Sequence, residues 1–281
     1  MPETVPVTVH LFALNRAFEA TQCRSTLFCS EITLPTEIHG GCDPLPCSVD
    51  EAQAQAALAD GRVLDALSVL HASSRSGASS SDVQIRFLFA SAHALLNQAN
   101  RVAAERTIQT ALRILAEGSP LQRGLQLPEW LVLSTTALLR RDWQSCGLWL
   151  RQVERSLQKI HEVASSCSFR HAAGDLLAIR GCVFAEQGVK GEAELMLTQA
   201  TECHDSADSR LSAVRDRILL SRVHMATEQY QAAELRLIEA ESQLRACKDL
   251  DAQSQRLRRA IENDRRVMES QSAAVRMATW N

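Results

Sequence analysis

The stretch Ile179–Glu202, IRGCVFAEQGVKGEAELMLTQATE, decides the fold, because its three glycines fit either a phosphate-binding loop or a joint between two packed helices. A Walker loop needs four residues between its glycines and a Gly-Lys-Ser/Thr ending, and GVKGEAEL has neither. No β-branched strand precedes the stretch, so it does not match a dinucleotide fingerprint either. We therefore expect Gly181 at a close helix crossing, and Gly188 and Gly191 in the turn and at the start of the next helix.

The same pattern of small and large residues occurs five times along the chain. Each copy has small residues on one helix, a short turn, and then a small, an aliphatic and a small residue on a second helix. The copies are Ala54, Ala57, Gly61, Ala66 and Leu70; Leu88, Ala92, Leu95, Ala104, Ile108 and Ala111; Trp130, Leu133, Ser134, Ala137, Cys146, Leu150 and Val153; Leu177, Gly181, Phe184, Ala193, Leu197 and Ala200; Leu220, Ser221, His224, Ala233, Leu237 and Ala240. Five copies exceed the three or so that a repeat array needs to bury a continuous core.

This order of residues resembles the tetratricopeptide repeat over residues 49–243. Trp130 matches the family's first signature position, whereas Arg180 stands where the family expects Leu. The packing positions Ala66, Ala104, Cys146, Ala193 and Ala233 lie 38, 42, 47 and 40 residues apart, compared with about 34 in the family. We therefore expect longer helices or fuller loops. The resemblance implies an all-α fold, a right-handed α-solenoid of about five helix pairs.

Both ends of the chain differ from the repeats. Residues 1–48 contain none of the pattern, and we expect an irregular, partly disordered segment. Residues 244–281 carry Leu250, Leu257, Ile261 and Met268 on one helical stripe with charges elsewhere, as in the polar-faced capping helix that ends a repeat array. All seven prolines lie at or before Pro128, which suits the first turn of the helix that carries Trp130.

Composition argues against a nucleic-acid or membrane protein. Hydrophobic residues make up 46% of the 281 residues and aromatic residues only 4%, which favours close-packed helices, and the net charge is −3. The arginines between Arg256 and Arg266 alternate with acidic residues, so we expect a solvated helix face there. No window approaches 18 consecutive apolar residues, and no secretory signal is recognised. We expect a protein of the cytoplasm or nucleus.

The nine cysteines are scattered and odd in number, so we expect reduced thiols. Cys23, Cys29, Cys42 and Cys47 lie near each other in the chain but lack the CxxC spacing of structural zinc sites. His39–Cys42, HGGC, could supply half a site, and metal binding there stays open. We expect no cofactor elsewhere.

We expect no catalytic cysteine. Cys203 is adjacent to His204 only in sequence, and neighbours on a helix point apart. The register places Cys182 on the inner face of its helix and Cys146 at a packing position. We therefore expect the protein not to be an enzyme.

The resemblance implies that the first helix of each pair lines a concave groove that binds a peptide or a partner helix. The groove positions assigned by register are Arg86, Phe89, His93, Asn97, Asp175, Cys182, Glu186, Arg215, Arg222 and Met225. Lysines and asparagines of the family's carboxylate clamp are absent, so a chaperone tail is not the expected ligand. Arginines at both ends with apolar residues between them suggest an acidic and hydrophobic segment. Alternatively, the arginines pair with neighbouring helices.

The predicted function is a non-catalytic protein–protein interaction scaffold or adaptor that works as a subunit of a larger assembly. The alternative is a regulatory sensor, in which the same helices bind a small peptide or metabolite and relay the change to a partner protein. The residues alone do not identify the partner.

Overall fold

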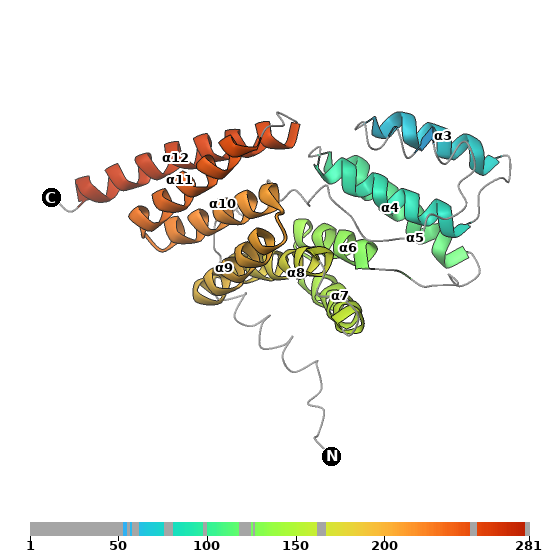
Figure 1. The fold of residues 1–281 in the computed structure, drawn as a ribbon, viewed down its shortest axis with the longest axis horizontal. Helices are drawn as coiled ribbons and strands as arrows, with labels where there is room; N and C mark the ends of the chain where they lie inside the picture. The colour runs from blue at the N-terminus through green and yellow to red at the C-terminus, as the bar shows by residue number, and fades with distance from the viewer. Residues whose placement is uncertain are drawn as a thin grey trace, which may run out of the picture.

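The computed structural model describes residues 53–54, 57, 62–75, 81–97, 100–117, 125, 127–161, 167–247 and 252–278. This part of the chain is all-α, and its helices follow an arc that begins at α3 and ends at α12 (Figure 1). The ten helices of the described residues are α3 (Val63–Arg75), α4 (Ser81–Asn97), α5 (Arg101–Glu117), α6 (Leu127–Leu139), α7 (Trp143–His161), α8 (Cys167–Glu186), α9 (Lys190–Ser206), α10 (Arg210–Ala226), α11 (Tyr230–Ala246) and α12 (Ala252–Ala278). Residues 1–48 lie outside the description.

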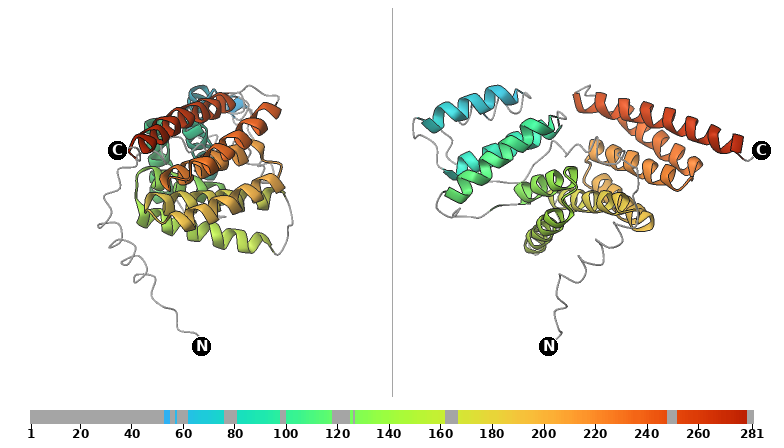
Figure 2. Two further views of the ribbon diagram at one scale, coloured as in Figure 1. Left: turned by 90° about the vertical axis from the view of Figure 1, so that its left-hand side faces the viewer. Right: turned by 180° about the vertical axis from the view of Figure 1, so that it is seen from behind.

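The helices pack as sequential antiparallel pairs, as the sequence predicted. α4 pairs with α5, α6 with α7, α8 with α9 and α10 with α11, while α3 packs on α4. The first helices of successive pairs also touch one another: α4 meets α6, α6 meets α8, and α8 meets α10. The two further views show the same succession of pairs from the end and from behind (Figure 2). Each pair therefore packs on its neighbours in the chain.

The long repeat spacing comes from both helix length and loop length. α9, α10 and α11 each have 17 residues and are joined by the three-residue turns 207–209 and 227–229, which accounts for the 40 residues from Ala193 to Ala233. α7 and α8 are longer, with 19 and 20 residues, and match the 47-residue spacing before Ala193. The prediction of longer helices is confirmed.

Four of the turns share one local structure. Arg141, Gly188, Asp208 and Glu228 have φ values of 57°, 77°, 54° and 60°. The residue after each of them donates its backbone N–H to the carbonyl oxygen five residues earlier, for example Val189 to Phe184. This is the Schellman motif that ends helices, and it normally favours glycine at the positive-φ position. The turn predicted at Gly188 is confirmed.

Gly181 lies at the close crossing that was predicted for it. A Cβ atom on Gly181 would lie 2.6 Å from Cγ of Leu197 and 3.3 Å from the carbonyl oxygen of Ala193, both on α9. Contacts under about 3.4 Å force neighbours apart, so α8 and α9 pack this closely only because residue 181 has no side chain. Pro128 lies in the first turn of α6, also as predicted.

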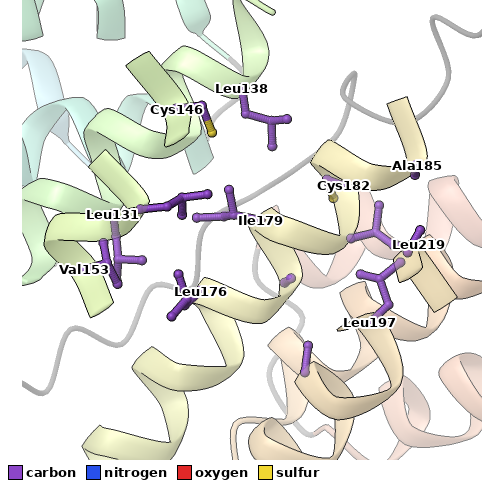
Figure 3. Packing of buried hydrophobic residues seen from close by; sticks show 14 of the residues in the cluster. Leu131, Leu138, Cys146, Val153, Leu176, Ile179, Cys182, Ala185, Leu197 and Leu219 are labelled. Carbon is purple, nitrogen blue, oxygen red and sulfur yellow. The ribbon is translucent and has the colours of Figure 1, made fainter. Parts of the chain in front are cut away.

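The core is a chain of three hydrophobic clusters. α6 contributes Val132 to the first cluster, with α3–α5, and Leu138 to the second, which extends to α10 (Figure 3). α10 contributes Leu220 to the second cluster and Ile218 to the third, with α11 and α12. In the second to fifth copies the predicted packing residues are buried, except for Trp130, Leu177 and Phe184, which are half-buried. In the first copy Ala54, Ala57 and Ala66 are buried, and Gly61 and the Leu70 side chain lie outside the description. Because α6 and α10 belong to two clusters each, they connect the pairs.

α12 has the amphipathic packing predicted for the C-terminal helix, although residues 244–246, which the prediction assigned to it, belong to α11. Leu257 and Ile261 join the third cluster, Met268 is buried, and the residues between them include the exposed Arg258 and Glu262. Leu250 lies outside the description. The helix covers α11 and α10, so its apolar stripe closes this end of the core.

Candidate functional site

The predicted groove residues lie on the first helices of the pairs, but most of their side chains are covered by neighbouring helices. Seven of them are buried: Phe89 and His93 on α4, Asp175, Cys182 and Glu186 on α8, and Arg215 and Arg222 on α10. Arg86 and Met225 are half-buried, and the side chain of Asn97 lies outside the description. Contact of these residues with a partner stays a prediction, and among the described side chains only Arg86 and Met225 offer a partner appreciable surface.

The arginines of this set pair with neighbouring helices, which was the alternative considered from the sequence. Nη1 of Arg86 on α4 lies 3.6 Å from Oε1 of Glu129 on α6. Arg222 on α10 binds Asp264 on α12 through both Nε and Nη2, at 2.8 and 3.2 Å. Each pair joins the first helix of one repeat to the helix two further along the chain, so these arginines already have carboxylate partners.

Arg215 belongs to a larger buried cluster of polar side chains where α8, α9 and α10 meet. Its Nη2 atom lies 3.3 Å from Oδ1 of Asp175 on α8, and its Nε atom donates to Asp216 at 2.9 Å. Nδ1 of His204 on α9 lies 2.6 Å from Oδ2 of Asp216. The other ring nitrogen of His204, Nε2, lies 3.3 Å from Oδ1 of Asp175. Two carboxylates thus hold His204 from opposite sides.

His171 completes this cluster at its more open edge. Its Nε2 atom lies 3.5 Å from Oδ2 of Asp175, one helical turn further along α8. Its Nδ1 atom lies 2.5 Å from the hydroxyl of Ser209, in the turn before α10. The His171 and His204 rings meet edge to face at 5.2 Å. The side chain of His171 is 14% exposed, whereas that of His204 is fully buried.

His204 lies between two carboxylates that determine its charge. Burial opposes a charge on His204, but Asp216 and Asp175 outweigh it and raise the pKa of His204 to about 9. Burial likewise opposes ionisation of Asp175, but the hydrogen bond from His204 and the charge of Arg215 lower its pKa to about 2. At neutral pH His204 is therefore protonated, and it and Arg215 both contact the carboxylates of Asp175 and Asp216.

A glycine on α8 makes room for the buried imidazole. A Cβ atom on Gly174 would lie 2.6 Å from Nε2 of His204 and 2.7 Å from its Cε1. The ring thus packs directly on the α8 backbone. Of the two α8 glycines, only Gly181 was predicted at a close crossing. The contact at Gly174 was missed, although Gly174 lies seven residues, about two turns, before Gly181 on the same helix face.

The cysteines that were weighed as nucleophiles have raised pKa values. Burial raises the pKa of Cys146 and of Cys182 to about 12, so both remain thiols at neutral pH. Both are part of the second hydrophobic cluster (Figure 3). Burial also raises the pKa of Cys203. Cys23, Cys29, Cys42 and Cys47, whose metal binding was left open, lie outside the described residues.

Comparisons with known proteins give no assignment. No protein-family model, no curated protein and no solved structure matches this chain. In the described part of the chain, none of the helices is long and apolar enough to cross a membrane. The function must therefore be argued from the packing and from the surface of the molecule.

Proposed function

We propose that this protein is a non-catalytic scaffold, a right-handed solenoid of tetratricopeptide-like helix pairs that binds a partner protein as a subunit of a larger assembly. The observation that carries the proposal is the ordered stacking of the pairs, in which the first helices α4, α6, α8 and α10 touch in sequence. Arrays of this kind present an extended surface built from equivalent positions of successive repeats.

Exposed leucines at equivalent repeat positions support protein contact. Leu148 on α7, Leu195 on α9 and Leu235 on α11 each follow a buried packing residue by two positions, and they are 43%, 50% and 53% exposed. Ile238, one turn after Leu235, is 50% exposed. A single exposed leucine needs no explanation, but the same exposed residue in three consecutive repeats indicates a shared role. We call Leu148, Leu195, Leu235 and Ile238 the leucine face.

The leucine face is a better candidate surface than the predicted groove. An acidic ligand was expected because the predicted groove contains arginines on the first helices of the pairs. However, Arg86, Arg215 and Arg222 each contact a carboxylate of the protein itself. An apolar surface instead favours a partner that contributes apolar side chains, such as an amphipathic helix. On this proposal the ion pairs hold the first helices of the pairs to their neighbours, and the second helices α7, α9 and α11 contact the partner.

Affinity purification followed by mass spectrometry tests this function. The tagged full-length chain is compared with the double variant Leu195→Glu/Leu235→Glu and with the control variant Gln199→Glu/Gln231→Glu, which places the same charges at exposed polar positions of the same helices. We expect one stoichiometric partner with the wild-type chain and the control, and its loss with the leucine variant. Circular dichroism checks that both variants fold.

One outcome would count against the scaffold function, and another would count only against the leucine face. If no stoichiometric partner is recovered from the cells that express the protein, the scaffold function loses its basis. If a partner is recovered equally well with the leucine variant, the scaffold function stands but the leucine face is not the contact surface.

A further inference from the structure

Three side chains of the buried polar cluster have the geometry of metal ligands. His171 and Asp175 lie one turn apart on α8, and His204 approaches them from α9. One ligand atom from each residue lies within 4.8 Å of the other two. Nε2 of His171 is 3.5 Å from Oδ2 of Asp175, and Nε2 of His204 is 3.3 Å from Oδ1 of Asp175. Tetrahedral zinc with bonds of about 2.1 Å separates its ligand atoms by about 3.4 Å. Each imidazole nitrogen lies close to that distance from one oxygen of Asp175, and a small adjustment of the Asp175 carboxylate would bring one oxygen to both.

The far nitrogens of both imidazoles are held by outer partners. Nδ1 of His204 lies 2.6 Å from the Asp216 carboxylate, and Nδ1 of His171 lies 2.5 Å from the Ser209 hydroxyl. Histidines that bind metals are usually oriented in this way, through a hydrogen bond from the nitrogen that does not face the ion. Both outer partners come from α10 or from the turn before it. The two rings are thus fixed with their Nε2 atoms towards Asp175.

The position of the three ligands within the protein suits a bound metal ion. His204 and Asp175 are buried, and Gly174 lets the His204 ring lie against the α8 backbone beside the other two ligands. His171, the most exposed of the three, gives the ion and a fourth ligand such as water an approach from solvent. An ion at this point would link α8 to α9, with α10 orienting the ligands.

We propose that His171, Asp175 and His204 bind one zinc ion, with Asp216 and Ser209 positioning the two imidazoles. The mixed nitrogen and oxygen ligand set is common for zinc in proteins. Three protein ligands leave a fourth position for water or an anion. This proposal concerns the junction of α8, α9 and α10 and does not depend on the partner-binding function.

Zinc would replace a proton on His204 when it binds. Without an ion, Nε2–H of His204 points at Asp175 and at the carbonyl oxygen of His171, which is 3.2 Å away. Zinc needs the lone pair of this nitrogen, so binding releases one proton from His204. The cluster, with Arg215 still beside Asp175, then gains one net positive charge, which favours an anionic fourth ligand.

Metal content of the full-length protein tests the proposal. The protein is expressed with added zinc, dialysed, and measured by inductively coupled plasma mass spectrometry as wild type, as His171→Gln and as His224→Gln. His224 is a matched control, because it is a buried histidine whose Nδ1 lies 3.0 Å from Oε1 of Gln229, within its own turn. We expect the wild type and His224→Gln to hold one zinc ion per chain more than His171→Gln.

A difference between variants isolates this site from any zinc held by the N-terminal cysteines, because all variants retain those cysteines. Cobalt substitution gives a second readout, since imidazole and carboxylate ligands produce visible d–d bands without the charge-transfer bands of thiolates. Ser209→Ala keeps all three ligands and is expected to weaken zinc binding about 10-fold. Equal metal content in the wild type and His171→Gln, including none in either, would overturn the proposal, as would unchanged affinity in both His171→Gln and Ser209→Ala.

Discussion

Replacing Gly174 with alanine should destabilise the protein strongly, although alanine is the better helix former. The added Cβ would lie 2.6 Å from Nε2 of His204, compared with about 3.4 Å for an ordinary contact, so the ring or the helix must shift by about 0.8 Å. Asp216 and Asp175 hold the ring on both sides and prevent an easy retreat. Overpacking costs about 1–3 kcal/mol and a broken buried ion pair about 3–5 kcal/mol, whereas helix propensity returns about 1 kcal/mol. Together these terms give an expected net loss of about 3–7 kcal/mol.

Gly147 on α7 provides a matched control, because a Cβ added there meets nothing within 4 Å. Gly147→Ala should therefore raise stability by about 0.5–1 kcal/mol through helix propensity alone. Urea denaturation followed by circular dichroism at 222 nm, with a chelator present, measures both variants against the wild type. If Gly174→Ala is as stable as the wild type, or more stable as expected for Gly147→Ala, then the His204 ring does not pack as closely on α8 as described.

Four further predictions use the same assay. Gly181→Ala should lose about 1–3 kcal/mol, because its Cβ would meet a buried leucine of α9 at 2.6 Å; an unchanged midpoint would contradict the crossing. Asp264→Ala should lose about 3–5 kcal/mol by leaving Arg222 buried without this carboxylate, and Arg222→Met/Asp264→Leu should recover most of the loss. Glu228→Gly should be neutral or gain up to about 1 kcal/mol, since its φ is 60°; a clear loss would contradict the turn. The pKa of His204, about 9, lies above its ordinary value of 6.5. The proton on His204 should therefore stabilise the metal-free protein fully below pH 6.5, and this contribution should be lost as pH rises through 9. A free energy of unfolding that does not change over that pH range would count against the charges assigned around His204.

The helix pairs were predictable because their determinants are local in sequence. The turn at Gly188 and the spacing of Ala193, Leu197 and Ala200 each involve residues within about two turns of each other. The crossing at Gly181 joins two helices that follow each other directly in the chain. The positive φ of Glu228 was not predicted, since its type gives no indication of that conformation. The same turn nevertheless forms there, because the Schellman hydrogen bonds and the packing of two long helices outweigh a local strain of about 1–2 kcal/mol.

The polar cluster was not predicted, because its members are far apart in the chain. His171 and Asp216 are separated by 45 residues, and only the packing of α8, α9 and α10 brings them together. His204 was considered from the sequence only as a neighbour of Cys203. One indication was present, namely several charged residues on helices that also carry core positions, but sequence register does not show which helix covers which face.

The same lack of tertiary information explains the buried groove residues. A helical register assigns Arg215 and Arg222 to one face of α10, but it does not show that α8, α9, α11 and α12 all pack on that helix. As a result 12 of the 17 residues of α10 are buried. The surface that remains exposed is set by the packing of the whole array, and the leucine face became recognisable only when the exposure of equivalent positions could be compared.

Buried charges between the inner helices have a structural consequence that apolar contacts would not provide. Contacts between alanine and leucine side chains are nearly non-directional, so helices that pack through them can shift along each other at little cost. The two-point contact of Arg222 with Asp264 fixes the position of α10 relative to α12, and the contact of Nη2 of Arg215 with Asp175 ties α10 to α8. Replacing such a pair with apolar residues often leaves stability unchanged, whereas breaking it is costly. We therefore infer that these ion pairs determine the spacing of neighbouring repeats more than they determine stability, and that they hold the exposed leucines of α9 and α11 in register for a partner.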